Sequence, residues 1–89
     1  MPYRITPYRP GVKYETEYRK TLRGAHSSAE RLLRDRILIP YFVEIAERGE
    51  VAYSTGAKKF YKWNVIEQMP PKDSADYRER IKTITKRGN

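Results

Sequence analysis

Cysteine is absent from this sequence, and histidine occurs once, at His26. Without cysteine no disulfide can crosslink the fold, and a single histidine leaves too few ligands for a zinc site. No run of 18 apolar residues occurs, and the N-terminal residues contain no apolar signal segment. We therefore expect neither a membrane span nor a secretory signal, and a cytoplasmic, nucleoid-associated or virion location.

The motifs of the common enzyme classes are also missing. The five glycines are isolated, so no glycine-rich phosphate loop is present, and neither HExxH nor GxSxG occurs. Glu44 and Glu47 lie three residues apart, which indicates a solvated helix face rather than an acid/base pair. His26 is expected to be an exposed loop residue. We therefore expect no enzymatic activity, no catalytic residues, no cofactor and no metal.

Positive charge is abundant and unevenly distributed. The 89 residues carry a net charge of +8. Basic residues exceed acidic ones by six to two in residues 1–26, four to one in 53–72 and five to three in 73–89. Residues 27–52 have four basic and five acidic residues and are the most apolar part. This pattern predicts one small domain whose core is flanked by surfaces that bind a polyanion.

Three prolines occur within residues 1–12, which predicts an extended basic arm ahead of a single helical domain at 13–89. The arm holds two of four Tyr-Arg pairs, where chance predicts about one in the whole chain. Arginine pairs with phosphates and tyrosine stacks on bases, but both residues are also favoured at protein interfaces. The partner of the arm therefore remains open between nucleic acid and protein.

Helical spacing of apolar residues predicts a mainly α domain of three to five short helices. The expected helices cover 13–23, 28–38 with Ser27 as N-cap, 41–48, a segment from Ser54 or Thr55 to near Val65, and a last helix that Asp73 or Ser74 caps. One β-hairpin is an alternative for 37–53, with its turn at 47–50. The helical pattern there is cleaner, and we prefer it.

Residues 42–60 resemble the helix-turn-helix and winged-helix DNA-binding superfamily. In that superfamily an alanine packs between two helices, a glycine opens the turn and an apolar residue anchors the second helix; Ala46, Gly49 and Val51 match these positions. The resemblance implies that the second helix is a recognition helix. Lys58, Lys59 and Lys62 would then contact phosphates or base edges, and Asn64 would read a base.

Two functions follow from these patterns. The first is a small basic nucleic-acid-binding protein, a transcription regulator or architectural factor, with DNA favoured over RNA. The second is a non-enzymatic structural or assembly subunit of a virion or ribonucleoprotein, whose arm docks on neighbouring subunits; a homodimer is also open, and no membrane partner is expected. For the first, the expected nucleic-acid contacts are Arg4, Arg9, Lys58, Lys59, Lys62, Asn64, Arg78, Lys82 and Lys86, with aromatic contacts from Tyr3, Tyr8, Tyr61 and Trp63.

Overall fold

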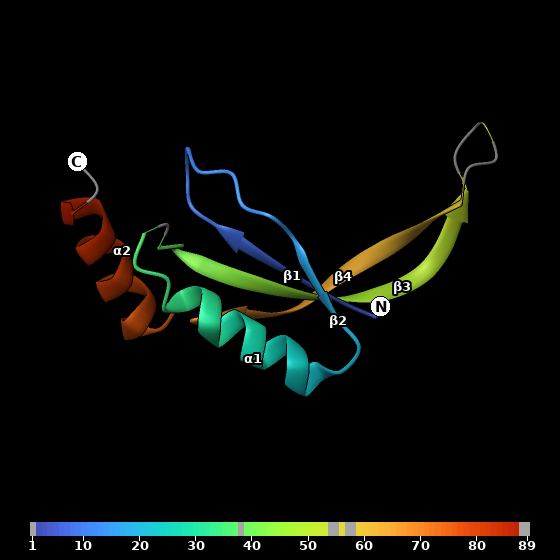
Figure 1. Cartoon of the computed structure of the whole chain (residues 1–89), viewed down its shortest axis with the longest axis horizontal. Coiled ribbons are helices and arrows are strands. Elements are labelled where there is room, and N and C mark those ends of the chain that lie inside the picture. Colours follow the sequence, from blue (N-terminus) through green and yellow to red (C-terminus); the bar gives the residue numbers. More distant parts are fainter. Residues whose placement is uncertain (1, 38, 54–55, 57–58, 88–89) are drawn as a thin grey trace.

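The computed structural model describes residues 2–37, 39–53, 56 and 59–87 of the chain. Four strands form one antiparallel sheet in the order β2-β1-β3-β4, with one helix against a face of the sheet and the other at its end (Figure 1). The elements in chain order are β1 (Tyr3–Tyr8), β2 (Glu17–Arg19), α1 (Leu22–Leu33), β3 (Phe42–Tyr53), β4 (Lys59–Met69) and α2 (Ala75–Arg87). The fold is therefore a sheet-rich α/β fold, and the prediction of a mainly α domain was wrong.

The helix predicted over 41–48 is part of β3. The side chains of Val43 and Ile45 point to one face of the sheet and are buried under α1, while those of Phe42 and Ala46 point to the other face. Because α1 covers one face of this part of β3 and aromatic rings pack on Phe42 on the other face, its apolar residues occur at adjacent positions and imitate a helical stripe. The alternative hairpin with a turn at 47–50 is not formed either, since β3 continues to Tyr53.

The helix predicted from Ser54 or Thr55 to near Val65 is largely β4. The part of this segment that the structure describes is rich in aromatic and β-branched residues, which favour strands over helices. Register shifts interrupt the β3–β4 pairing between Ile45 and Ala46 and between Arg48 and Val51. The residues that resemble a helix-turn-helix thus lie mainly in two paired strands.

The N-terminal segment is extended, as its prolines predicted, but it is an inner strand of the sheet rather than a separate arm. β1 pairs with β2 through Tyr3–Ile5 and with β3 along its full length. Pro7 is buried opposite Val43, beyond the last residue of β1 that pairs with β2. At Pro7 the side of β1 that faces away from β3 therefore has no neighbouring strand, and a residue without an N–H group is tolerated at such an edge.

The helix predicted over 13–23 is also wrong, because this segment contains β2 and only the first two residues of α1. Thr21, rather than Ser27, is the N-cap of α1, and its hydroxyl accepts a hydrogen bond of 3.0 Å from the Gly24 amide. The last predicted helix is confirmed as α2. Its N-terminus is capped by Ser74, whose Oγ accepts a 3.1 Å hydrogen bond from the Tyr77 amide.

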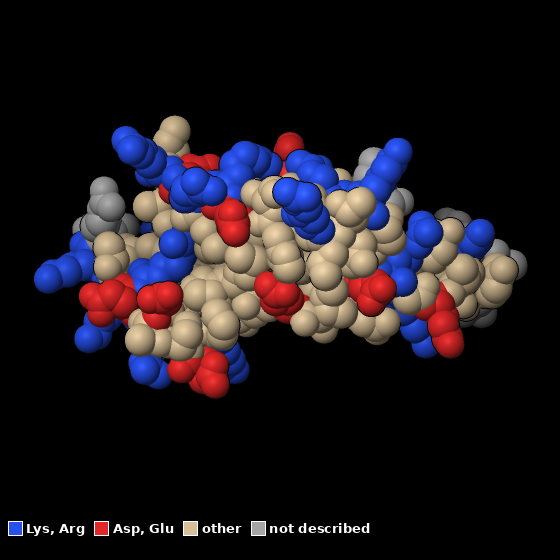
Figure 2. All heavy atoms as spheres, turned by 90° about the horizontal axis from the view of Figure 1, so that it is seen from below, with Lys and Arg blue, Asp and Glu red and all other residues tan. Residues whose placement is uncertain are grey.

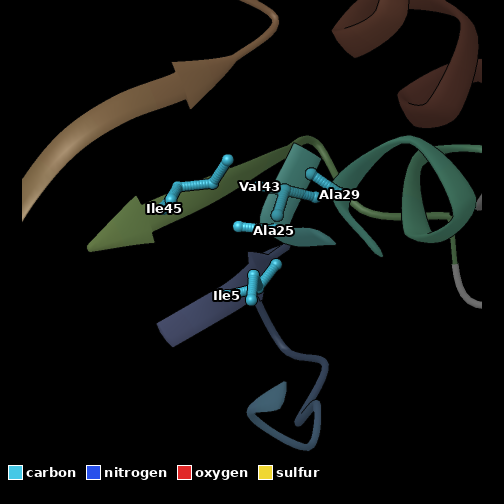
Figure 3. Close-up of a cluster of buried hydrophobic side chains, with 5 residues drawn as sticks. All are labelled: Ile5, Ala25, Ala29, Val43 and Ile45. Carbon is cyan, nitrogen blue, oxygen red and sulfur yellow. The ribbon is translucent and has the colours of Figure 1, made fainter. Parts of the chain in front are cut away.

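The core lies between α1 and the face of the sheet that α1 covers (Figure 3). Small side chains on α1 let the helix approach the sheet closely, and branched side chains of β1 and β3 fill the space beneath it. The buried cluster consists of Ile5, Ala25, Ala29, Val43 and Ile45.

Polar side-chain contacts link α1 to the sheet at both edges of this face. Glu17 of β2 accepts hydrogen bonds of 2.5 and 2.6 Å from the Arg31 guanidinium. At the opposite edge, His26 Nε2 lies 2.9 Å from the Glu67 carboxylate of β4. His26 is therefore a helix residue that contacts the sheet, not the exposed loop residue that we expected.

The molecule is elongated, with principal extents of 47 × 27 × 23 Å. Its radius of gyration is 14.8 Å, against about 12 Å for a compact domain of this length. The elongation arises because α2 packs at one end of the sheet while the β3–β4 hairpin extends beyond α1 at the other (Figure 1). Figure 2 shows a row of Lys and Arg side chains along the upper long edge of the molecule and more of them at both ends, with Asp and Glu scattered between them.

Candidate nucleic-acid interface

The sheet face that turns away from α1 is covered by no helix along β4 and the outer half of β3, among the described residues. Successive side chains of a strand point to opposite faces, so Arg4 lies on this open face because Ile5 lies under α1. Arg4 pairs with Tyr18 of β2 and with Ala46 of β3, and Ala46 pairs with Val65 of β4. These four residues form one row across the open face.

The Trp63 side chain lies across this row. Its ring is 5.0 Å from the Arg4 guanidinium carbon and its centroid is 5.9 Å from that of Tyr18, although Trp63 belongs to β4 and Tyr18 to β2. To reach them the indole must pass over Ala46, whose methyl group leaves the required room. Ala46 is accordingly only 2% exposed on a face without a helix.

The same arrangement continues along the β3–β4 hairpin. Arg48 is the cross-strand partner of Trp63, and its guanidinium lies 4.5 Å from the centroid of the Tyr61 ring. Lys59, two residues before Tyr61, places its ammonium group 5.7 Å from the same ring. Both contacts have the geometry of cation–π interactions.

Cations and aromatic rings therefore alternate along a continuous path from β2 to the outer part of the hairpin. Cations can neutralise phosphates, and flat rings can stack on bases or on other planar groups. Glu44 also belongs to the open face, but it lies toward the α2 end, opposite Thr6 and Gln68. We call this path the open-face track; it consists of Tyr18, Arg4, Trp63, Arg48, Tyr61 and Lys59.

Four of the residues predicted to contact nucleic acid lie together in this track: Arg4, Lys59, Tyr61 and Trp63. Tyr18 and Arg48 also belong to it but were not among the predicted contacts. Tyr18 lies in one of the four Tyr-Arg pairs and was assigned to a helix, and Arg48 was assigned to the outer surface of another helix. Reading 17–19, 3–8 and 42–53 as paired strands would have placed Tyr18 opposite Arg4, and Arg48 on the same face two residues beyond Ala46.

The remaining predicted contacts lie elsewhere. Tyr3 packs against the core, and Asn64 lies on the α1 side of the sheet next to Gly49. Lys62 is exposed, and strand alternation directs it to that side too. Lys58 is outside the described residues. At the α2 end, Tyr8 stacks on Phe42 with ring centroids 4.9 Å apart; the predicted basic contacts at this end are Arg9, Arg78, Lys82 and Lys86.

The Tyr-Arg pairs do not act as units in the sheet. In Tyr3-Arg4 the tyrosine faces the core and the arginine faces the open side. In Tyr18-Arg19 the two directions are exchanged, and Arg19 donates a 2.8 Å hydrogen bond to Glu17. Adjacent strand residues point to opposite faces, so each pair contributes one contact residue and one structural residue.

A second basic region lies between α2 and the segment that follows α1. It is a groove of about 620 Å³ whose lining includes Arg9, Arg34, Arg36 and Arg80. The Arg80 guanidinium is used internally, because it donates to the backbone carbonyls of Leu33 (2.6 Å) and Pro40 (2.8 Å). Burial lowers the pKa of Arg80 from its ordinary value, as expected when a cation loses water. Acidic residues also line the groove, so it is less suited to a polyanion than the open-face track.

Within the described residues, no cluster of three or more His, Asp or Glu side chains could hold a metal ion. No described helix is both long enough and apolar enough to cross a membrane. Comparisons of the chain with protein-family models, curated proteins and solved structures found no match. The candidate interface therefore rests on the geometry of this chain alone.

Proposed function

We propose that this chain is a small, non-enzymatic nucleic-acid-binding protein whose contact surface is the open-face track. The observation that supports this proposal is the alternation of three cations with three aromatic rings on an uncovered sheet face. Phosphates and bases alternate along a nucleic acid in the same way, so one surface can satisfy both. The net charge of +8 adds a long-range attraction for any polyanion.

The recognition helix implied by the sequence resemblance has no part in this proposal. Lys59, Lys62 and Asn64 lie on a strand and point to different sides of it. A preference for DNA over RNA rested on that helix. The charges and rings of the track fit the backbone and bases of either nucleic acid.

No observation in the structure favours the second function, an assembly subunit that docks through a free arm. Residues 3–8 are held between β2 and β3, and Arg48 donates a backbone hydrogen bond of 2.7 Å to the Pro2 carbonyl. Tyr3 of this segment packs against the core, Tyr8 stacks on Phe42, and Arg4 lies against Trp63 on the open face.

Binding can be tested by fluorescence anisotropy with labelled oligonucleotides of random sequence over a series of salt concentrations. Three cations in contact with phosphates predict a slope of log K against log salt of about −2 to −3. Arg48→Gln should weaken binding and make the slope shallower by about one phosphate contact. The matched control is Arg34→Gln, which removes an exposed arginine at the C-cap of α1, on the other side of the sheet.

The proposal predicts that Arg34→Gln binds with nearly the wild-type affinity. Equal losses for both variants would assign the binding to overall charge rather than to the open face. No binding at low salt by a folded protein would overturn the function itself.

A further inference from the structure

We propose that the open-face track binds single-stranded rather than duplex nucleic acid, by stacking unpaired bases on Tyr18, Trp63 and Tyr61. This inference rests on the proposed function and specifies its ligand. The argument depends on the shape of the face, on the accessibility of the rings, and on what the rings contact in the free protein.

The shape of the face does not suit a duplex. A duplex buries the flat surfaces of its bases in its own stack and exposes only their edges, in grooves that a protruding element must enter. The track lies on a sheet surface, and α1 packs on the opposite side of that sheet (Figure 1). Aromatic side chains lying on such a surface can reach the flat side of a base only when the base is unpaired.

The rings are exposed enough to be used. Tyr18 is 44% exposed and Tyr61 is 36% exposed, while Trp63 is half-buried. Tyr61 and Trp63 are two residues apart on β4, which separates their positions by roughly 7 Å along the strand. Three rings spread over three strand positions provide platforms for about three nucleotides, a number typical of a sheet that binds a single strand.

The free protein already contains substitutes for the proposed ligand. The guanidinium group of Arg48, a flat cation, lies over the Tyr61 ring, and the guanidinium group of Arg4 lies over the Trp63 ring. A base that takes the place of either guanidinium would release the cation to pair with the neighbouring phosphate. Arg4 is suited to this exchange, because its Nε is buried without a hydrogen-bond partner among the described residues.

The chain carries its own probe of this site, since Trp63 is its one tryptophan. Intrinsic fluorescence should be titrated with oligothymidylate and oligouridylate of about 12 nucleotides, within the range of single-strand site sizes, and with a duplex of the same length. The proposal predicts that either single strand quenches Trp63. It also predicts that the strand binds at least about tenfold more tightly than the duplex at the same salt concentration.

A pair of variants separates stacking from general hydrophobic contact. Tyr61→Leu removes the ring from the track and should weaken single-strand binding by about fivefold or more. Phe60→Leu is the matched control, because Phe60 is the adjacent strand residue, is 47% exposed and points to the other face. The affinity of Phe60→Leu for the single strand should remain within about twofold of the wild-type affinity. Both variants should unfold in a cooperative transition on heating, which shows that they are folded.

The possible outcomes are distinct. Single-strand preference together with a loss in Tyr61→Leu alone supports the inference. Equal or tighter binding of the duplex, or equal losses in both variants, overturns the inference but leaves nucleic-acid binding in place. If neither a single strand nor a duplex binds at low salt, both the inference and the proposed function fail.

Discussion

Replacing Ile5 by alanine tests whether residues 3–8 are an inner strand or a free arm. Ile5 is 0% exposed and lies in the cluster beneath α1. The substitution removes three carbons, worth about 2.4 kcal/mol at roughly 0.8 kcal/mol for each. The cavity left behind raises the expected loss to about 3–4 kcal/mol. For 89 residues the free energy of unfolding should be about 4–13 kcal/mol, so this loss would be a large part of the total.

The assay is urea unfolding, followed in parallel by Trp63 fluorescence and by circular dichroism. Ile37→Ala is the matched control, because Ile37 is 87% exposed and its loss should cost less than about 0.5 kcal/mol. We expect a lower midpoint for Ile5→Ala with little change in the slope of unfolding free energy against urea. If both variants unfold at the same urea concentration, residues 3–8 do not belong to the core and the reasoning is refuted.

Three further predictions concern stability away from the open face. Thr21→Ala removes the N-cap of α1 and should lower the free energy of unfolding by about 1 kcal/mol, whereas Thr21→Ser should retain most of it; equal losses would contradict the capping role. Arg80→Met removes donors to two backbone carbonyls, so α2 should show faster amide hydrogen exchange than in wild type, and unchanged exchange would contradict its structural role. Burial raises the pKa of Tyr14 above 10.0, chiefly by desolvation, so its contribution to stability is complete below pH 10 and is lost as the pH rises further. Tyr14→Phe should therefore flatten the fall in urea midpoint between pH 9 and 11, and an unchanged fall would contradict this assignment.

The signals for helix ends were read correctly only in part. Asp73 and Ser74 were the two candidate caps of the last helix, and Ser74 is the cap; capping depends on one side chain and the three residues that follow it, so a sequence can reveal it. The expected cap Ser27, by contrast, lies inside α1, which begins at Leu22. Such signals are local, and the tertiary structure can override them.

The sheet could not be predicted in the same way, because its pattern is set by which strands become neighbours. Phe42 to Ala46 reads as a helical face until Val43 and Ile45 are known to pack under α1 while Phe42 and Ala46 point to the opposite face of the sheet. The short β2 has three residues and no apolar alternation of its own. It is a strand because β1 lies beside it.

The residues of the candidate site also divide into those that residue type alone predicts and those that depend on strand pairing. Arg4, Lys59, Tyr61 and Trp63 were selected by residue type, since cations near aromatic rings suit nucleic acids wherever the fold places them. Tyr18 and Arg48 depended on strand pairing and were missed. Asn64 was selected for a recognition helix, and on β4 it packs beside Gly49 instead.

The position of β1 also has a consequence for the order of folding. Ile5 pairs with Ile45, forty residues further along the chain, whereas β3 and β4 are consecutive strands joined by a short connection. The hairpin can therefore form early from local contacts, while the pairing of β1 with β3 must bring distant parts of the chain together. Until β1 pairs with it, this edge of β3 is open to strands of other molecules. The β1–β3 pairing is thus expected to form after the hairpin, and the delay between the two sets the period in which this protein is most prone to aggregate.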